Sequence, residues 1–153
     1  MPLIGLISDT HGLLRPEAVT ALRGCEHIVH AGDIVGARIL EDLSILAPVT
    51  AVRGNNDTAS WSRSIPETDV LQAGDALIYV IHDLALLDID PAAAGMHAVV
   101  CGHSHKPKSE LKDGVLFVNP GSAGPRRFSL PISLGRLCVA GSRVTAELMD
   151  IAP

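Results

Sequence analysis

The stretch Ile7-Ser8-Asp9-Thr10-His11-Gly12 contains a pattern that recurs along the chain: a buried strand that stops abruptly at polar residues. Residues 3–7 are apolar or glycine and predict a short buried strand. Asp9 and His11, with one residue between them, can both reach a single divalent metal ion from a turn. A turn that caps the following helix would use the same residue types. The choice depends on whether later strands also end in metal ligands.

Composition indicates one globular domain over residues 1–153, with 47% hydrophobic residues and enough length to bury a core. The chain has one Trp, one Tyr and two Phe, too few for a nucleic-acid platform of stacked aromatic rings. Its net charge of −5 also disfavours a general polyanion-binding surface, so we expect no stable nucleic-acid binding. A bound metal would add positive charge that this count omits, which leaves phosphate chemistry open.

The sequence carries no signal for export or membrane insertion. Cys25, Cys101 and Cys138 are scattered and form neither a zinc motif nor a disulfide framework. The first residues lack a basic segment, so we expect no signal peptide. No apolar run approaches the roughly 20 residues that span a bilayer. We therefore expect a cytoplasmic protein without membrane association.

The first third of the chain reads as strand, helix, strand, helix, strand. This order predicts a parallel sheet with right-handed crossovers, in which ligands bind beyond the carboxyl ends of the strands. Later segments are richer in strands and predict either two sheets or one mixed sheet folded over, with helices outside. The expected strands cover residues 3–7, 27–31, 49–53, 67–73, 76–81, 98–101, 109–112, 115–118, 132–139 and 143–149. Helices are expected over residues 13–24 and 37–46, residues 57–64 form a loop or short helix, and residues 84–94 permit a helix that Pro91 would break.

Seven potential metal ligands follow the ends of these strands. They are too many for one tetrahedral zinc site but suit two ions that share a carboxylate. Mixed oxygen and nitrogen ligands favour manganese, iron, zinc or nickel over calcium or magnesium. Taken singly, Asp33 could cap a helix, Asn55 could be a left-handed turn residue, and His82 could be a buried core histidine. The set is Asp9, His11, Asp33, Asn55, His82, His103 and His105.

These residues resemble the signature of the calcineurin-like metallophosphoesterase superfamily. The matching segments, in order, are Asp9-Thr10-His11, Gly32-Asp33, Gly54-Asn55-Asn56-Asp57, His82 and Gly102-His103-Ser104-His105. The short chain, with Asn119-Pro120-Gly121-Ser122 and Pro125-Arg126, is similar to the compact YfcE-type phosphodiesterase branch. The resemblance implies an α/β fold, a four-layer α-β-β-α sandwich of two mixed sheets flanked by helices.

The resemblance also implies a dinuclear site and its chemistry. Asp9, His11 and His105 would hold one divalent ion, Asn55, His82 and His103 the other, and Asp33 would bridge them. The expected metal is Mn²⁺, with Ni²⁺, Zn²⁺ or Fe²⁺ as alternatives. The expected activity is hydrolysis of a phosphodiester by a metal-bridging hydroxide, with Asp33, Asn55, Asn56 and His103 as catalytic residues. A small-molecule phosphoester or a nucleotide would be the substrate.

Two other functions remain open at this point. A phosphomonoesterase would use the same metal site. A non-catalytic protein-binding scaffold would use the same fold, as the retromer subunit does. The chain's alanine and leucine content would also serve an interface, so a homo-oligomer is possible. Because a scaffold can lose ligands freely, the complete set of seven favours an enzyme.

The sequence departs from many superfamily members at Asn56, where they have a histidine that can protonate the leaving group. An amide cannot act as a general acid, so we expect a preference for esters with acidic leaving groups. His30 either orders Asp33 or is a plain core histidine, and Asp57 is expected to fix the Asn55 turn. Arg53, Arg126 and Arg127 could bind substrate phosphate or be solvated surface residues. The loop at residues 119–122 is expected to support the loop that carries His103 and His105, here called the histidine loop.

Overall fold

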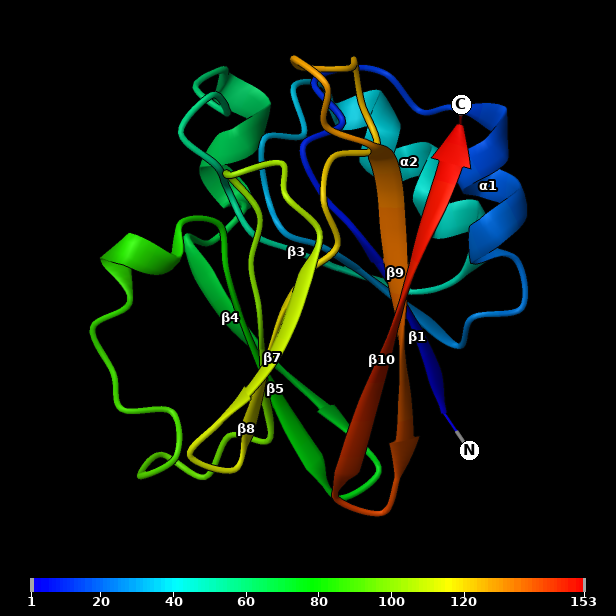
Figure 1. Ribbon diagram of the computed structural model, residues 1–153. Coiled ribbons are helices and arrows are strands. Elements are labelled where there is room, and N and C mark those ends of the chain that lie inside the picture. The colour runs from blue at the N-terminus through cyan, green and yellow to red at the C-terminus, as the bar shows by residue number, and fades with distance from the viewer. Residues whose placement is uncertain (1, 153) are drawn as a thin grey trace.

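Two five-stranded sheets organise the molecule, for which a computed structural model describes residues 2–152 (Figure 1). The terminal residues 1 and 153 of the expected domain lie outside this range. The first sheet has the order β10-β9-β1-β2-β3, from β1 (Leu3–Ile7), β2 (His27–His30), β3 (Val49–Ala51), β9 (Ile132–Ala140) and β10 (Arg143–Ala152). The second has the order β4-β5-β6-β8-β7, from β4 (Thr68–Ala73), β5 (Ala76–Ile81), β6 (Ala98–Val100), β7 (Lys108–Lys112) and β8 (Val115–Asn119).

Both sheets are mixed, as the sequence predicts, and the choice between two sheets and one folded sheet is settled in favour of two. In the first sheet β1, β2 and β3 are parallel, whereas β9 runs antiparallel to β1 and to β10. In the second, β5, β6 and β8 are parallel, and β4 and β7 are antiparallel edge strands. The parallel strands bring their carboxyl ends, and the polar residues that follow them, to one edge of each sheet.

The main core lies between the sheets. Leu6 and Val29 of the first sheet belong to the same buried cluster as Ile78, Val100 and Val118 of the second. These side chains alternate with residues on the outer face of each strand, as the pleat of a half-buried strand requires. This packed core holds the two sheets together and so fixes the positions of the strand ends relative to one another.

Helices α1 (Pro16–Leu22) and α2 (Ala37–Leu46) cover the outer face of the first sheet. Leu22 of α1 and Leu43 of α2 are fully buried there. Gly5 of β1 makes this close packing possible, because a Cβ at that position would lie 2.5 Å from Cδ2 of Leu22. The α2 bounds match the sequence prediction, while α1 is shorter than the predicted residues 13–24.

The outer face of the second sheet is covered mostly by a loop. Of the permitted helix over residues 84–94, only the 3-10 turn η2 (Leu84–Leu86) forms. The following residues include Pro91 and Gly95, which interrupt a helix. Leu87 and Ile89 nevertheless pack against Tyr79 of β5, so the loop completes the fourth layer. A second 3-10 helix, η1 (Ser60–Ser64), follows β3 at the expected position.

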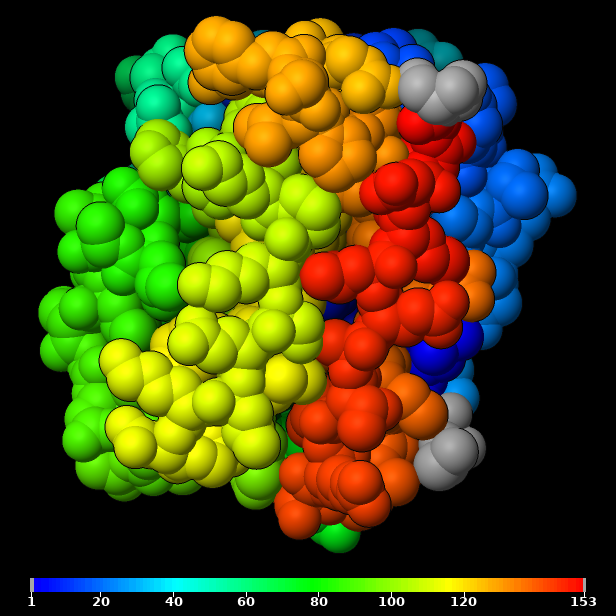
Figure 2. Space-filling model, viewed as in Figure 1, coloured from blue at the N-terminus to red at the C-terminus, as the bar shows by residue number. Residues whose placement is uncertain are grey.

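At one side of the molecule the edge strand β7 of the second sheet lies next to the edge strand β10 of the first (Figure 2). The loop after β8, orange in the figure, overhangs their upper end. No helix in the described part of the chain is long and apolar enough to cross a membrane.

Candidate metal centre

The predicted ligands all follow strand ends, and five of the seven have an unusual backbone conformation. Asp9, His11, Asp33, His103 and His105 have φ angles between 45° and 71°, in the left-handed region. Each such non-glycine residue costs on the order of 1–3 kcal/mol, and such strain collects at functional sites. The loops that carry these residues lie in the upper part of Figure 1.

Six of the seven predicted ligands form two compact groups. In one group, atoms of Asp9, His11 and His105 that could bind a metal lie within 4.8 Å of one another, and the same holds for Asp33, His82 and His103. The first group is the set that the family resemblance assigns to one ion. The second contains His82 and His103 of the other assigned set together with the expected bridging residue Asp33, and lacks Asn55. The geometry therefore gathers the predicted residues, while metal binding itself stays a prediction.

The two carboxylates connect the groups. Oδ1 of Asp9 lies 3.5 Å from Nε2 of His105, 3.8 Å from Nε2 of His11 and 3.9 Å from Nε2 of His82. Oδ2 of Asp33 lies 3.3 Å from Nε2 of His82 and 3.7 Å from Nε2 of His11. Ligands held about 2.0–2.2 Å from one ion lie roughly 3–3.6 Å apart, so the spacings of 3.3 and 3.5 Å fit shared coordination and the other three are slightly longer. Asp9 and Asp33 each face imidazoles of both groups.

Three of the atoms that would bind metal lack hydrogen-bond partners. Oδ1 of Asp9, Nε2 of His11 and Nε2 of His82 are buried without a hydrogen bond among the described residues. Buried polar atoms are almost always hydrogen-bonded. Three neighbouring buried atoms without a hydrogen bond therefore indicate that a ligand binds between them. The donor set of carboxylate oxygens and imidazole nitrogens suits a divalent transition metal. The residues present therefore fit the predicted ions.

His82 is oriented by the main chain of the first sheet. Its Nδ1 donates to the carbonyl oxygen of Ala31 at a distance of 2.7 Å, which leaves the Nε2 lone pair for a metal. Gly32 permits this contact, because a Cβ there would lie 2.6 Å from Nδ1 of His82. Gly32 also has a φ of +103°, which only glycine adopts readily.

Charge within the cluster shifts several pKa values. Burial works to raise the pKa of Asp33, but His82 and the Asn56 donors outweigh it and hold the pKa below its ordinary value. Burial works to lower the pKa of His82, and the carboxylates of Asp33 and Asp9 reverse this to a raised pKa. The pKa of Asp9 is raised, chiefly by burial. Burial, with Arg127 and His11 nearby, lowers the pKa of His105.

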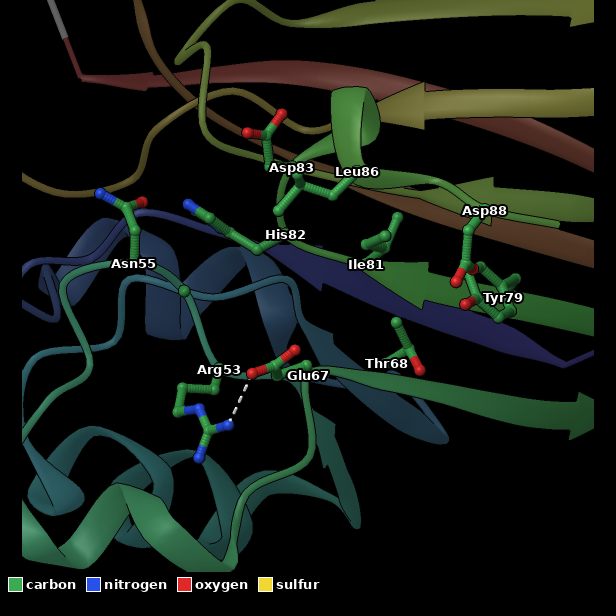
Figure 3. A pocket seen from close by; sticks show the side chains of 11 residues that line it. Arg53, Asn55, Glu67, Thr68, Tyr79, Ile81, His82, Asp83, Leu86 and Asp88 are labelled. Atoms are coloured by element: carbon green, nitrogen blue, oxygen red, sulfur yellow. Dashed lines mark hydrogen bonds and ion pairs between the residues drawn. The ribbon is translucent and has the colours of Figure 1, made fainter.

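Asn55, the seventh predicted ligand, lies on the exposed turn after β3, across from His82 (Figure 3). Asp57 holds this turn, as expected: its carboxylate accepts hydrogen bonds from the backbone of Gly54 at 2.9 Å and of Val35 at 2.8 Å. Gly54 allows the turn to approach Asp33, because a Cβ at position 54 would lie 2.2 Å from Oδ1 of Asp33. The turn and Asp33 are therefore held as one unit.

Asn56 contacts Asp33 directly. Its backbone N–H donates to Oδ1 of Asp33 at 2.9 Å, and its side-chain Nδ2 donates to Oδ2 at 3.0 Å. The side-chain amide of Asn56 is thus directed at the carboxylate expected to bridge the ions.

His30 is a fully buried residue that ties two loops together without touching the Asp33 carboxylate. Gly32 N–H donates to its Nδ1 at 3.1 Å, which places the ring proton on Nε2. Nε2 contacts Oγ1 of Thr10 at 3.0 Å, and that hydroxyl donates to the carbonyl of Ile34 at 3.0 Å. Of the two roles left open for His30, the structure supports a hydrogen-bonded core histidine.

The loop after β8 supports the histidine loop, as expected. Nδ2 of Asn119 donates to the carbonyl of Gly102 at 2.9 Å and to Oγ of Ser104 at 3.0 Å. Oγ of Ser122 donates to the carbonyl of Asp9 at 3.0 Å. The turns that carry Asp9, His103 and His105 are therefore joined.

Sequence reasoning missed two residues that contact the centre. Oγ of Ser8 donates to Oδ2 of Asp9 at 2.8 Å, and Asp83 lies with Oδ2 3.9 Å from Nε2 of His103. Their positions directly beside Asp9 and His82 in the sequence were the available signal. Neither adjacency by itself shows which way a side chain points.

Two cavities adjoin the centre on different sides. The arginine cavity, of about 310 Å³, is lined by His11, His105, Pro125, Arg126 and Arg127. The second, of about 380 Å³, lies beside Asn55 and His82. Its lining includes Glu67, Asp83 and Asp88, and we call it the acidic cavity. Arg53, a predicted phosphate ligand, lines the acidic cavity but pairs with Glu67 at 2.9 Å (Figure 3).

Comparisons with known proteins agree with this geometry. A family model described as the calcineurin-like phosphoesterase superfamily domain matches residues 3–141. The chain is 36% identical over 160 aligned positions to a probable metallophosphoesterase from Methanothermobacter thermautotrophicus, covering 96% of this chain and 91% of that protein. It is 28% identical over 137 positions to a phosphodiesterase from Methanocaldococcus jannaschii, covering 77% and 82% of the two chains. Vacuolar Protein Sorting 29 from Cryptosporidium parvum has the same fold, with a TM-score of 0.84, 23% identity and coverage of 99% and 92%.

Proposed function

The chain belongs to the calcineurin-like phosphoesterase superfamily, and we propose that it is a phosphodiesterase that uses two divalent metal ions. The observation that carries the proposal is the convergence of Oδ1 of Asp9, Nε2 of His11 and Nε2 of His82, all buried and without hydrogen-bond partners. Asp9, His11 and His105 would hold one ion, and Asn55, His82 and His103 the other. Asp33, which faces both groups, would contact both ions.

The proposed reaction is hydrolysis of one ester bond. When bound, the two ions would supply a hydroxide nucleophile near neutral pH and neutralise charge on the phosphoryl oxygens. An oxygen–phosphorus bond forms from water, the bond from phosphorus to the alcohol oxygen breaks, and the departing alkoxide takes a proton from solvent. Mn²⁺ is the metal we propose, because the donor set mixes oxygen and nitrogen.

The chain's own residues prepare this chemistry by orienting the ligands. The lowered pKa of Asp33 keeps its carboxylate ionised at neutral pH, and the two donors of Asn56 fix its orientation. His103 is exposed and can contact a bound phosphate as well as a metal. Asn56 cannot protonate the leaving alkoxide, so the proposed enzyme depends on solvent for that proton.

Two features support a diester over a monoester. Cavities lie beside both groups of the centre, so a phosphate held there has space for two alcohol arms. The relative from Methanocaldococcus jannaschii is a phosphodiesterase. Arg126 and Arg127 would bind phosphate oxygens or an anionic arm from the arginine cavity, where guanidinium groups match phosphate geometry.

The proposal is tested with chelator-treated protein reloaded with Mn²⁺, Ni²⁺, Co²⁺, Zn²⁺ or Mg²⁺. Hydrolysis of bis(p-nitrophenyl) phosphate, faster than that of p-nitrophenyl phosphate, is the expected result. Faster cleavage of the monoester would reassign the protein as a phosphomonoesterase. Hydrolysis of neither ester by metal-loaded protein would favour a protein-binding scaffold of the same fold.

A further inference from the structure

The acidic cavity beside His82 is lined by both apolar and acidic side chains (Figure 3). Tyr79, Ile81 and Leu86 contribute apolar surface. Its acidic lining residues are Glu67, Asp83 and Asp88, and its one basic lining residue is Arg53. A cavity of this kind suits a ligand that carries both carbon and positive charge.

The negative charge of this cavity is only partly balanced. Arg53 pairs with Glu67 at 2.9 Å, which removes the guanidinium as a partner for other groups. Among the described residues, Asp83 and Asp88 have no arginine or lysine within ion-pair distance. Oδ1 of Asp83 accepts from the backbone N–H of Ala85 at 3.0 Å, and its Oδ2 lies 3.9 Å from Nε2 of His103. Asp88 therefore lines this space without a permanent cation, whereas the Asp83 carboxylate is directed toward Ala85 N–H and His103.

The cavity is also connected to the proposed reaction centre. His82, which lines it, is 4% exposed, and its Nε2 has no hydrogen-bond partner. Figure 3 shows the His82 ring extending toward the side of the cavity that carries Asn55, whereas Asp88 lies at the opposite end. An alcohol arm that extended from a phosphate at the centre into this cavity would pass Ile81 in the direction of Asp88.

We propose that the acidic cavity binds an alcohol arm that carries an ammonium group, so that the preferred substrates are phosphodiesters of amino alcohols. This inference rests on the proposed phosphodiesterase function and names its substrate class. Asp88 would be the main specificity residue, because it lies farthest from the positive charge of bound ions. The opposite, arginine cavity would disfavour the same cation, which gives the diester one orientation.

A nucleobase arm fits this cavity less well. Bases bind chiefly by stacking on aromatic faces. The only aromatic residue of the lining, Tyr79, is 8% exposed and offers little such surface. Carboxylates accept hydrogen bonds without donating them, so they match an ammonium group better than the mixed donor and acceptor edge of a base.

The test compares two substrates that differ only in charge. One is p-nitrophenyl phosphocholine, and the other is its uncharged isostere, in which a tert-butyl group replaces the trimethylammonium group. With Mn²⁺-loaded protein, we expect kcat/KM to be higher for the choline ester by roughly fivefold or more, as for a partly solvated charge contact. Salt should reduce this ratio, because the contact is partly exposed.

Matched variants assign the preference to the cavity. Asp88→Asn should reduce the ratio toward one. Asp75→Asn removes the same charge from the exposed turn between β4 and β5, outside the cavity, and should leave the ratio unchanged. Equal kcat/KM values for the two esters in the wild-type protein, or an unchanged ratio in Asp88→Asn, would overturn the inference.

A binding measurement separates failure of the inference from failure of the proposed function. Calorimetry with phosphocholine and its tert-butyl isostere requires no turnover. Tighter binding of phosphocholine, lost in Asp88→Asn, would support the cavity assignment even if bis(p-nitrophenyl) phosphate were not hydrolysed. Hydrolysis of that diester together with equal binding of the two monoesters would retain the function and reject the cavity assignment.

Discussion

The side-chain amide of Asn56 donates a hydrogen bond of 3.0 Å to Oδ2 of Asp33, the oxygen that also lies 3.3 Å from Nε2 of His82. A residue that stands where many relatives in the superfamily carry a general acid thus orients a proposed metal-bridging carboxylate. This relationship separates two roles for position 56, orienting Asp33 and supplying a proton, that substitutions can distinguish.

Asn56→His should raise hydrolysis of diesters with alkoxide leaving groups by roughly tenfold or more, because general acid catalysis is typically worth about 10²–10⁴-fold. It should give no such gain for p-nitrophenyl esters, whose leaving groups need no proton. Asn56→Ala should instead lower kcat for both substrate types, because Asp33 loses a donor. A series of leaving groups of rising pKa measures this, and an unchanged dependence in Asn56→His would contradict the account.

Asp33→Asn should fold but lose most of its response to metal. Binding of an ion at about 100 times its Kd stabilises a protein by roughly 2.7 kcal/mol, which corresponds to about 5–10 °C in Tm for a chain of this size. We expect the wild-type Tm to rise by this amount with Mn²⁺ and that of the variant to rise much less. Asp69→Asn on the exposed edge strand β4 is the matched control. An equal metal-induced shift in Asp33→Asn would remove Asp33 from the ligand set.

Asp57→Asn should disturb the turn that carries Asn55. The Asp57 carboxylate accepts three backbone N–H groups, from Ile34, Val35 and Gly54. An amide NH₂ in this place would face a donor, so we expect a loss of about 2–4 kcal/mol in the free energy of unfolding. Urea denaturation measures the loss, and a stability within about 0.5 kcal/mol of wild type would show that Asp57 is not needed.

His30 should make the folded protein sensitive to acid. Burial lowers its pKa from 6.5 to about 3, so below pH 6.5 the unfolded chain binds a proton that the folded chain excludes. The stability that this group contributes is therefore lost as the pH falls from about 6.5 toward 3, and amounts to about 2 kcal/mol between pH 7 and 5.

His30→Asn should remove this part of the acid sensitivity. Asn can still accept from Gly32 N–H but does not titrate, so the variant should be less stable at pH 7 and lose less stability on acidification. Urea denaturation at pH 7 and pH 5 in chelator tests this. Equal losses in both proteins would show that His30 does not carry the effect.

The first half of the fold follows closely from the sequence because its signals are local. Short apolar runs end in glycine and polar residues, and the bounds of α2 match the apolar periodicity of residues 37–46. The two ligand groups were also predictable, since parallel strands bring successive turns to one edge. The loop over residues 87–96 was not, because its apolar residues face the second sheet while its backbone forms only isolated turns and no continuous helix.

What sequence reasoning could not supply were side-chain directions set by distant segments. Arg53 was a candidate for phosphate binding until the structure placed Glu67, 14 positions away, within 2.9 Å of it. His30 and Asn56 both lie near Asp33 in the fold, yet only Asn56 contacts its carboxylate. Such partners depend on how strands β2, β3 and β4 are placed in space, which no local pattern encodes.

The central claim, a phosphodiesterase that depends on two metal ions, is tested most directly by one titration. Chelator-treated protein is titrated with Mn²⁺ while hydrolysis of bis(p-nitrophenyl) phosphate is followed. We predict no hydrolysis without metal and a rise that saturates at two Mn²⁺ per chain, one for each ligand group. Hydrolysis that persists in chelator, saturates at one ion, or never appears with any amount of Mn²⁺ would contradict the account.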